Sequence, residues 1–454
     1  MIDESGANPM RTTGDGEPGP PPRRLRLPRA LLIAALLLHI LPFAVRPALI
    51  GGDEPHYALM AHSIATDFDL ALDDDYQAVE EGSPAAGRKR RGERLDRHLR
   101  EANGRRVFSH PLGLPLLAAP LLAIQQAIAP GSAPDIPLGL LTLAVTFAAL
   151  VSAAKLLWGV TGSIRDTSLL LFATYFASPM WFYSRTFFTE PYIWAWSVLA
   201  ITSMARRRFG LASLFLALAL AMKETALLIV LPLIVAGGFL FGFRALLMLT
   251  AGPVVFAALF ALKNLMTVGN PLTTFQPYQI GDFLRGSVEL TVGANRGLLW
   301  FAPLLALAVG GWVLRRDASA NRVAGWTSAA IFASWFLVTA AWADPGGGSS
   351  YGPRLLVPAL PALLIPLQRF TSHFERRPWQ ILAFGIALAG FVVNWCAAVD
   401  PFTALWGPSA IELVRKNAIP AAGGAILGAA ILIALMRIPP GIDGRSAVSQ
   451  PRSA

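Results

Sequence analysis

Residues 136–158 read IPLGLLTLAVTFAALVSAAKLLW, a run of 23 residues in which Lys155 is the only charged side chain. A helix needs about 20 predominantly apolar residues to cross the hydrocarbon core of a bilayer, so this run has the composition of a membrane span. Twelve further apolar blocks repeat the pattern, at 30–50, 112–129, 167–182, 191–205, 211–222, 225–241, 245–262, 298–314, 324–342, 355–367, 381–399 and 421–436.

The overall composition agrees with a membrane domain. Only 15% of the 454 residues are charged and 54% are apolar, whereas a soluble domain carries about 25% charged residues. The net charge of +10 does not indicate nucleic-acid binding, because most Lys and Arg residues lie between apolar blocks, where membrane topology explains them. Cys396 is the only cysteine, which excludes an intramolecular disulfide.

Basic clusters follow several blocks with a regular spacing: two apolar blocks separate each consecutive pair. The positive-inside rule predicts this regularity if all the clusters are cytoplasmic. The clusters are Arg206-Arg207-Arg208, Arg244, Arg315-Arg316 with Arg322, Arg369 with Arg376-Arg377, and Arg437.

Near the N-terminus the alternation fails, because three blocks separate the first basic residues from Lys155 and Arg165. We interpret 112–129 as the block that does not cross. It contains Pro115 and Pro120, so we expect a poor, interrupted helix in an interfacial or re-entrant segment. Twelve crossings then remain, with both chain ends in the cytoplasm.

The predicted fold is an all-α polytopic membrane protein of about 12 transmembrane helices with a long first extracytoplasmic loop. We expect a disordered cytoplasmic N-terminus at 1–29, a transmembrane domain at 30–437 that includes the loop 51–111, and a cytoplasmic tail at 438–454. Between Arg88 and Arg106 the loop holds nine basic and three acidic residues. This segment is either a solvated, mobile stretch or a surface that binds an anionic lipid or acceptor.

Polar residues gather at the predicted outer ends of the helices. Asp53 and Glu54 directly follow the first block, and two adjacent carboxylates there supply either a general base with its support or an acidic helix end. Arg185 and Glu190 occupy the second outer loop, as a local ion pair or as part of a site. Lys223-Glu224 interrupts an apolar run, and ionisable residues in such runs usually face a cavity or a partner.

Two glycine-containing motifs precede later blocks. One is Asn295-Arg296-Gly297, and the other runs from Gly346 through Tyr351 to Arg354. Glycine allows close backbone approach to a ligand, and an Arg at a helix start suits a phosphate. The alternative for the glycine run is a flexible loop.

No established metal or nucleotide motif is present: the sequence has no Walker sequence, dinucleotide fingerprint, CxxC or HExxH. The six histidines show no strong metal spacing, so no metal ligand is predicted. His56 and His62, six residues apart near acidic residues, leave a divalent metal as an option.

Taken together, these motifs resemble those of the GT-C membrane glycosyltransferases, such as the protein O-mannosyltransferases and the lipid A aminoarabinose transferase. The resemblance rests on the order of Asp53-Glu54 after the first helix, the stretch from His110 to Pro115, Glu190 in the second outer loop, and Tyr351-Gly352-Pro353-Arg354. It covers most of residues 30–370. The basic segment 88–106 and the absence of a large C-terminal soluble domain depart from the family pattern.

The resemblance implies a GT-C fold and an inverting transfer of a hexosyl or pentosyl group from a polyprenyl-phosphate carrier to an envelope glycan, lipid or protein acceptor. It implies a bacterial inner membrane with the active site on the extracytoplasmic face. In this sequence it implies that Asp53 is the base, that Glu54 supports it through a basic partner, and that Glu190 positions acceptor or base. Expected donor-phosphate ligands are Arg354, Arg296, Lys223 and Arg185, and expected substrate contacts are His56, Tyr57, His110 and Tyr351.

Two other functions stay open at the level of sequence. A transporter or flippase for a lipid-linked sugar usually has repeats and broken helices with charges at mid-membrane, whereas here the ionisable residues gather at helix ends. A catalytically inactive scaffold is the third option.

Overall fold

The computed structural model describes residues 28–45, 51–102, 105–273, 278–312, 319–371 and 377–438. The predicted N-terminal segment and C-terminal tail lie almost wholly outside these ranges, as do Arg315-Arg316 and Arg376. Within them the chain is almost entirely helical, with one short two-stranded sheet.

Six stretches of the described residues are helical, long and apolar enough to cross a membrane. They correspond to α5 (Asp135–Thr161), α10 (Leu227–Phe241) with η3 (Glu224–Ala226) before it, α11 (Phe243–Val268), α15 (Ser319–Ala340), α17 (Arg377–Val399) and α20 (Ala418–Met436). Each coincides with a predicted apolar block. The structure therefore confirms an all-helical membrane protein, while helix lengths alone support six spans rather than twelve.

Other predicted blocks form shorter or interrupted helices. Prolines account for two of these interruptions. Pro303 begins a new helix one residue after the end of α13, and Pro358 and Pro361 lie in a 3-10 stretch. These segments are α1 (Arg29–Val45), α8 (Thr189–Ala205), α9 (Phe209–Met222), α13 (Leu298–Phe301), α14 (Pro303–Ala308) with η4 (Val309–Trp312), and η5 (Arg354–Leu363) with α16 (Leu364–Thr371).

The expectation that the block 112–129 is an interrupted helix is wrong. The block forms a continuous helix, α4 (Gly113–Ile128). Pro115 falls in the first turn, where a backbone N–H has no intrahelical acceptor to lose, so only Pro120 removes a hydrogen bond. The helix packs extensively against α2 (Glu54–Thr66), an element of the long loop.

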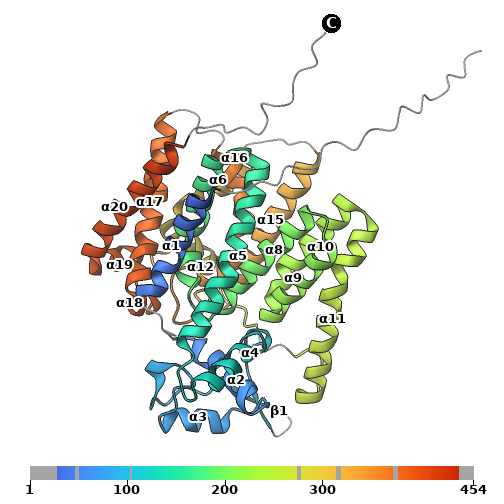
Figure 1. Ribbon diagram of the computed structural model, residues 1–454. Coiled ribbons are helices and arrows are strands. Elements are labelled where there is room, and N and C mark those ends of the chain that lie inside the picture. The colour runs from blue at the N-terminus through green and yellow to red at the C-terminus, as the bar shows by residue number, and fades with distance from the viewer. Residues whose placement is uncertain are drawn as a thin grey trace, which may run out of the picture.

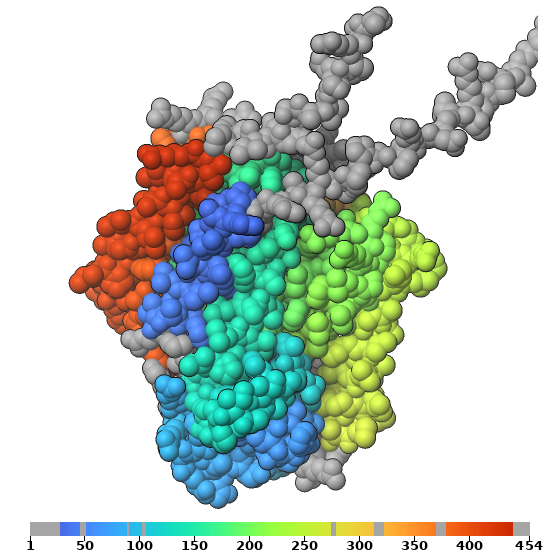
Figure 2. Space-filling view, in the orientation of Figure 1, coloured from blue at the N-terminus to red at the C-terminus, as the bar shows by residue number. Residues whose placement is uncertain are grey.

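The long loop is folded and forms one end of the molecule (Figure 1). Helices α2, α3 and α4 and strand β1 gather there, while the described chain approaches both termini at the opposite end. In Figure 2 these blue and teal residues form a compact lobe beneath the bundle. The loop comprises α2, α3 (Asp73–Glu80), η1 (Arg88–Arg90), β1 (Leu99–Ala102) and β2 (Arg105–Phe108), the strands being antiparallel with Leu99 opposite Phe108.

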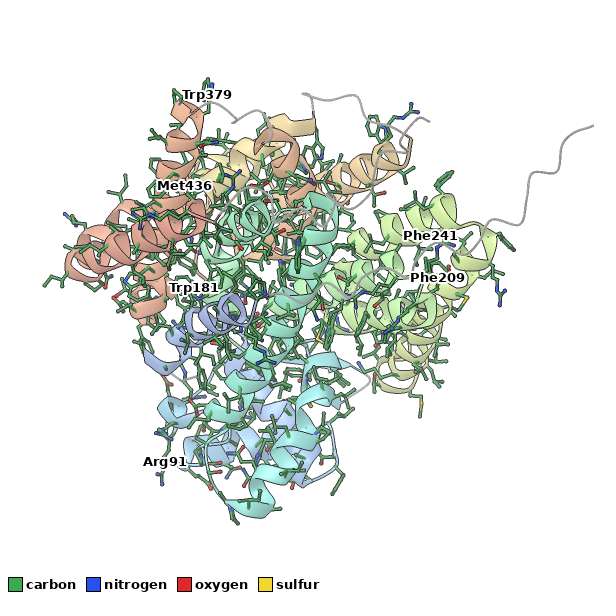
Figure 3. The ribbon with its side chains drawn as sticks, turned by 45° about the horizontal axis from the view of Figure 1, so that its top comes forward. Arg91, Trp181, Phe209, Phe241, Trp379 and Met436 are labelled. Atoms are coloured by element: carbon green, nitrogen blue, oxygen red, sulfur yellow. The ribbon has the colours of Figure 1, made fainter. Side chains whose placement is uncertain are left out.

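Side chains fix the loop to the bundle. The backbone N–H of Arg88 donates to the carboxylate of Asp135 at the start of α5, at 2.8 Å. Figure 3 places Arg91 in the loop lobe, Trp379 and Met436 at the far end, and Trp181 between them. Trp181 belongs to a buried aromatic cluster: its ring stacks on that of Phe391, and Phe176 and Tyr175 connect it to Trp194 in α8. The remaining elements are α6 (Ile164–Leu171), η2 (Phe172–Phe176), α7 (Pro179–Tyr183), α12 (Phe283–Thr291), α18 (Pro401–Leu405) and α19 (Ala410–Lys416).

Candidate active site

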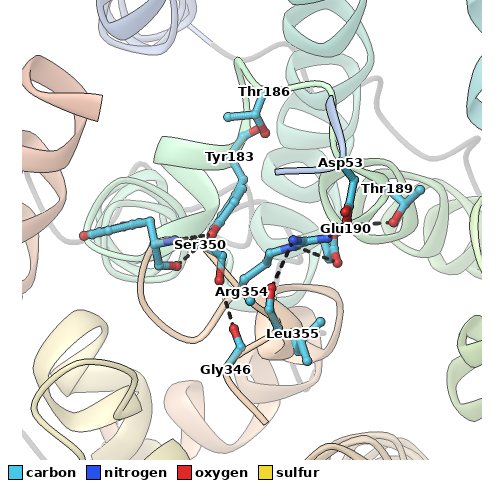
Figure 4. Close-up of polar contacts among 12 residues, drawn as sticks. Asp53, Tyr183, Thr186, Thr189, Glu190, Gly346, Ser350, Arg354 and Leu355 are labelled. Carbon is cyan, nitrogen blue, oxygen red and sulfur yellow. Dashed lines mark hydrogen bonds and ion pairs between the residues drawn. The ribbon is translucent and has the colours of Figure 1, made fainter. Parts of the chain in front are cut away.

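Arg354 joins two carboxylates from distant parts of the chain (Figure 4). Its Nη2 donates to Oδ2 of Asp53 at 2.7 Å, and its Nε donates to Oε1 of Glu190 at 3.1 Å. Its Nη1 donates to the carbonyl of Gly347 at 3.3 Å, and the guanidinium lies 4.1 Å from the ring centre of Phe188. One planar cation therefore fixes both predicted acidic motifs in a single arrangement.

The three residues meet because three helical segments begin at the same place. Asp53 is the N-cap residue of α2, Glu190 lies in the first turn of α8, and Arg354 is the first residue of η5. Carboxylates are favoured near helix N-termini, whereas a cation there is not. The two carboxylates therefore provide the attraction that holds Arg354 at this position.

The cluster is largely withdrawn from solvent. Side-chain exposure is 6% for Arg354, 2% for Glu190 and 22% for Asp53. Burial alone would raise the pKa of the Asp53 carboxyl, but the Arg354 guanidinium, with smaller contributions from His110 and Lys223, holds that pKa well below its usual range. Asp53 is thus ionised at physiological pH, and its more exposed side chain makes it the carboxylate that a substrate can reach.

Glu54 is fixed by the backbone. Its Oε2 accepts from the N–H of Gly51 at 3.1 Å, and its Oε1 accepts from the N–H of Phe187 at 2.7 Å. These bonds tie the start of α2 to the loop before α8. That Glu54 supports the base through a basic partner stays a prediction.

The glycine run is an ordered loop held by Arg296. The guanidinium of Arg296 donates to the carbonyls of Gly348 and Ser350. Gly347 and Gly348 have φ of +70° and +71°, a backbone conformation that disfavours other residues. Tyr351 is buried and exchanges backbone hydrogen bonds with the hydroxyl of Tyr183. Arg296 and Tyr351 thus shape the loop from which the Gly347 carbonyl reaches Arg354.

A cavity of about 130 Å³ adjoins the cluster on the Glu190 side. Its lining combines the ionisable Glu190, Lys223 and Glu224 with the aromatic Trp335 and Trp342. The ammonium of Lys223 lies 5.6 Å from the ring centre of Trp342. A cavity with a cation, carboxylates and apolar walls suits an amphipathic ligand that has an anionic group.

Histidines and aromatic residues surround Asp53 on the loop side. The ring of His56 stacks on that of His98 at 3.6 Å between centres, and Nδ1 of His98 lies 2.6 Å from Nε2 of His110. Tyr57 packs 5.2 Å from His110. Ligand atoms of Asp53, His98 and His110 lie within 4.8 Å of one another, so these residues could hold a metal ion.

Arg185 contacts a different part of the structure. It donates to the carbonyl of Pro42 in α1 and lies over the ring of Phe182. The other predicted site residues surround the Arg354 cluster, shape its loop, or line the adjoining cavity.

Sequence reasoning missed His98 and Phe188. His98 precedes a strand whose hairpin is signalled by the dipeptide Asn103-Gly104, the strongest short-range indication of a β-hairpin. That signal would have placed His98 and His110 at the base of one hairpin. Phe188 carried no signal, because an aromatic residue beside a helix start is usually a packing residue.

No family model matches the sequence, and no curated protein matches it. Among solved structures, the fold is similar to that of ArnT from Cupriavidus metallidurans bound to undecaprenyl phosphate, with a TM-score of 0.51 and 13% sequence identity. The match covers 90% of this chain and 75% of ArnT. The apo form of the same ArnT matches with a TM-score of 0.49 and 14% identity, over 90% of this chain and 76% of that one.

The similarity covers nine-tenths of this chain. It confirms the predicted likeness to the lipid A aminoarabinose transferase in fold. This chain therefore has an ArnT-like, GT-C membrane fold.

Proposed function

We propose that this chain is an inverting glycosyltransferase that moves a sugar from a polyprenyl-phosphate carrier to a hydroxyl acceptor at the extracytoplasmic face of a membrane. The observation that carries the proposal is the pairing of Asp53 and Glu190 through Arg354 within an ArnT-like fold. The ArnT structure contains undecaprenyl phosphate, which supports a carrier of that class here.

In the proposed reaction, the oxygen of an acceptor hydroxyl forms a bond to the anomeric carbon of the donor sugar. The bond from that carbon to the phosphate oxygen breaks, the polyprenyl phosphate leaves, and Asp53 takes the hydroxyl proton. A single displacement of this kind inverts the anomeric centre and needs one base. A phosphate leaving group needs little protonation, so no general acid is required.

Arg354 couples donor binding to the base. In the free protein its guanidinium lowers the basicity of Asp53. An anionic donor phosphate that draws on the same guanidinium weakens this effect and raises the basicity of Asp53 when the substrate is present. Arg354 also supplies positive charge where the leaving group develops negative charge. The base thus becomes effective only in the donor complex.

The cavity beside Glu190 is the proposed site of the donor phosphate and of the first part of its apolar chain. Lys223 supplies a cation there, and the Trp335 and Trp342 rings supply apolar walls. Glu190 faces both this cavity and Arg354, so it lies where donor and acceptor would meet. Arg296 supports the site through the glycine loop rather than through direct phosphate contact.

We further propose twelve crossings, with the loop 51–111 outside, the chain ends inside, and a bacterial inner membrane as the location. The folded loop at one end of the bundle and the described chain ends at the other support this arrangement. Labelling of single cysteines with an impermeant reagent in intact cells tests it, after Cys396 is replaced. A cysteine at position 91 should react and one at position 207 should not; the reverse pattern would invert the topology.

The decisive experiment is sugar transfer into membranes from a panel of radiolabelled polyprenyl-phosphate sugars. Wild type is compared with Asp53→Asn and with Asp73→Asn, a matched change in an exposed carboxylate of the same loop. Asp53→Asn should reduce transfer by about 10²- to 10⁴-fold at equal expression, as expected for a lost general base, and Asp73→Asn should not. Full transfer by Asp53→Asn would refute the proposed role.

If the wild type transfers sugar from no donor, binding of the lipid-linked sugars is measured next. Movement of a lipid-linked sugar between leaflets without any glycosylated product would replace the transferase with a transporter.

A further inference from the structure

Two histidines stand at the base of the loop hairpin and face each other. His98 directly precedes β1 and His110 follows β2 by two residues. The backbone N–H and the hydroxyl of Ser109 both donate to the carbonyl of His98, at 3.0 and 2.9 Å. These bonds extend the strand pairing to the hairpin base, so the two imidazoles lie together because the backbone places them there.

The Asp53 carboxylate completes a three-residue cluster. One ligand atom from each of Asp53, His98 and His110 can be chosen so that all three lie within 4.8 Å of one another. Ligands about 2.0–2.1 Å from a tetrahedral Zn²⁺ lie roughly 3.4 Å apart. The 2.6 Å separation of the two ring nitrogens and the 4.8 Å limit bracket this value, so small side-chain movements would suffice.

We infer that Asp53, His98 and His110 bind one divalent transition-metal ion of the Zn²⁺ class. Two imidazoles and one carboxylate form a donor set that suits such an ion, and three protein ligands leave a coordination position for an oxygen of a substrate. In the hydrogen-bonded histidine pair one nitrogen must carry a proton. A metal ion allows all three groups to donate electron pairs toward one centre.

Neighbouring side chains orient the rings, as residues that contact the ligands do at known metal sites. His56 stacks on His98, and Nδ1 of His56 lies 2.8 Å from the hydroxyl of Tyr76. The same hydroxyl accepts from the backbone N–H of His98 at 3.2 Å. Tyr57 and Phe108 pack against His110. The imidazoles are therefore held by aromatic walls and a shared tyrosine.

Metal binding would join the hairpin to the start of α2 and so fix Asp53 from the side opposite Arg354. The role of the ion in transfer rests on the proposed function, whereas its binding does not. An ion here would set the position of Asp53 and present an open site to an incoming oxygen. It would also make the hairpin part of the active site.

The test uses the purified full-length chain in detergent, freed of metal with a chelator and then titrated with Zn²⁺ or Co²⁺. One equivalent should remain after gel filtration, measured by elemental analysis, and the Co²⁺ form should show the absorption of an ion with nitrogen ligands. His98→Ala with His110→Ala should abolish retention, and the matched control His62→Ala should not. His56→Ala should lower Zn²⁺ affinity about 10- to 100-fold, because His56 stacks on the ligand His98 and orients its ring.

Retention of a full equivalent by the His98→Ala, His110→Ala protein, or none by the wild type, would overturn the inference. If that variant does not fold, X-ray absorption of the Zn²⁺-loaded wild type decides: two imidazole ligands support the site, and none refutes it. Metal binding by a protein that moves a lipid-linked sugar between leaflets without forming a glycosylated product would leave the metal site intact and refute the proposed function. Sugar transfer by a protein that binds no metal would refute the metal site and leave the proposed function standing.

Discussion

Two sets of ion pairs lie in and beside the loop lobe, and they differ in burial. Arg354 with Asp53 and Glu190 is mostly buried, with side-chain exposures of 6%, 22% and 2%. Arg97 and Arg106 both contact Asp73 at the loop surface, with exposures of 38%, 50% and 47%. The geometry is similar in the two sets, since the shortest contacts are 2.7 and 2.8 Å.

The difference shows that the distance between two charged groups does not by itself determine how much an ion pair contributes to stability. Exposed pairs are weakened by water and contribute about 0–1 kcal/mol, whereas a buried charge that loses its partner destabilises a protein by about 3–5 kcal/mol. Buried pairs are not strongly stabilising relative to apolar residues, so their presence calls for another reason. In this chain that reason is the proposed chemistry.

The largest effect is expected from Arg354→Met, which leaves Asp53 and Glu190 beside each other without their shared cation. The free energy of unfolding should fall by about 3–5 kcal/mol, and transfer should be lost. Thermal unfolding in detergent measures the first effect. Arg354→Lys should rescue only part of the stability, because an ammonium cannot bond both carboxylates in the geometry of a guanidinium. If Arg354→Met were as stable as the wild type, the buried cluster would contribute no more to stability than the exposed pairs do.

Lys223→Gln should have the next largest effect, on donor binding rather than on stability. Loss of a charged hydrogen bond to the donor phosphate removes about 1.5–3 kcal/mol, which corresponds to a rise in KM for the donor of about 10- to 100-fold. Steady-state kinetics with varied donor concentration measures it, and kcat should change less. Lys155→Gln, an exposed lysine in α5, is the matched control. An unchanged KM would remove Lys223 from the proposed donor site.

Asp75 is an intermediate case, a carboxylate of the loop that is mostly buried and whose Oδ2 has no hydrogen-bond partner among the described residues. Burial, with the neighbouring Asp74 and Asp67, raises its pKa to about 7. The unfolded chain loses this proton near pH 4 and the folded one near pH 7, so the carboxyl destabilises the fold increasingly across that window.

Asp75→Asn should therefore raise the melting temperature by a few degrees at pH 8 and by much less at pH 4.5. Melting curves at the two pH values, beside those of Glu101→Gln, an exposed carboxylate of the same loop, measure the difference. An equal gain at both pH values would show that the carboxyl does not titrate in this window.

The smallest effect is expected from Arg106→Gln, which breaks an exposed contact to Asp73. Stability should change by less than about 1 kcal/mol, and raised salt should reduce even that difference. Melting curves at low and high ionic strength measure it. A loss of stability as large as that of Arg354→Met would show that exposed and buried ion pairs contribute equally in this protein.

Much of the fold could be predicted from the sequence because membrane spans carry their own signal. The blocks that became α5, α17 and α20 are long and apolar, and their ends follow from the position of charged or glycine residues. The continuous helix over Gly113–Ile128 could not be predicted as easily, since the effect of a proline depends on its place in the turn. The sequence shows that a proline is present, but not in which turn of the helix it lies.

The candidate site was also predictable only in part. Asp53, Glu190 and Arg354 could be selected one by one, because each follows or precedes an apolar block. Their mutual contact could not, since Arg354 lies 301 residues from Asp53 and 164 from Glu190, and no periodic pattern extends over such separations. The direction of a side chain was equally hidden: Arg185 is near Glu190 in sequence yet contacts the carbonyl of Pro42.

The separation of 301 residues between Asp53 and Arg354 also sets a schedule for biosynthesis. Ribosomes add about 5–20 residues per second, so Arg354 is made on the order of 15–60 s after Asp53. Throughout that interval the nascent chain holds Asp53, and later Glu190, without the cation that joins them in the finished protein. Chains that stop before Arg354 carry both carboxylates without the cation that pairs them in the finished protein.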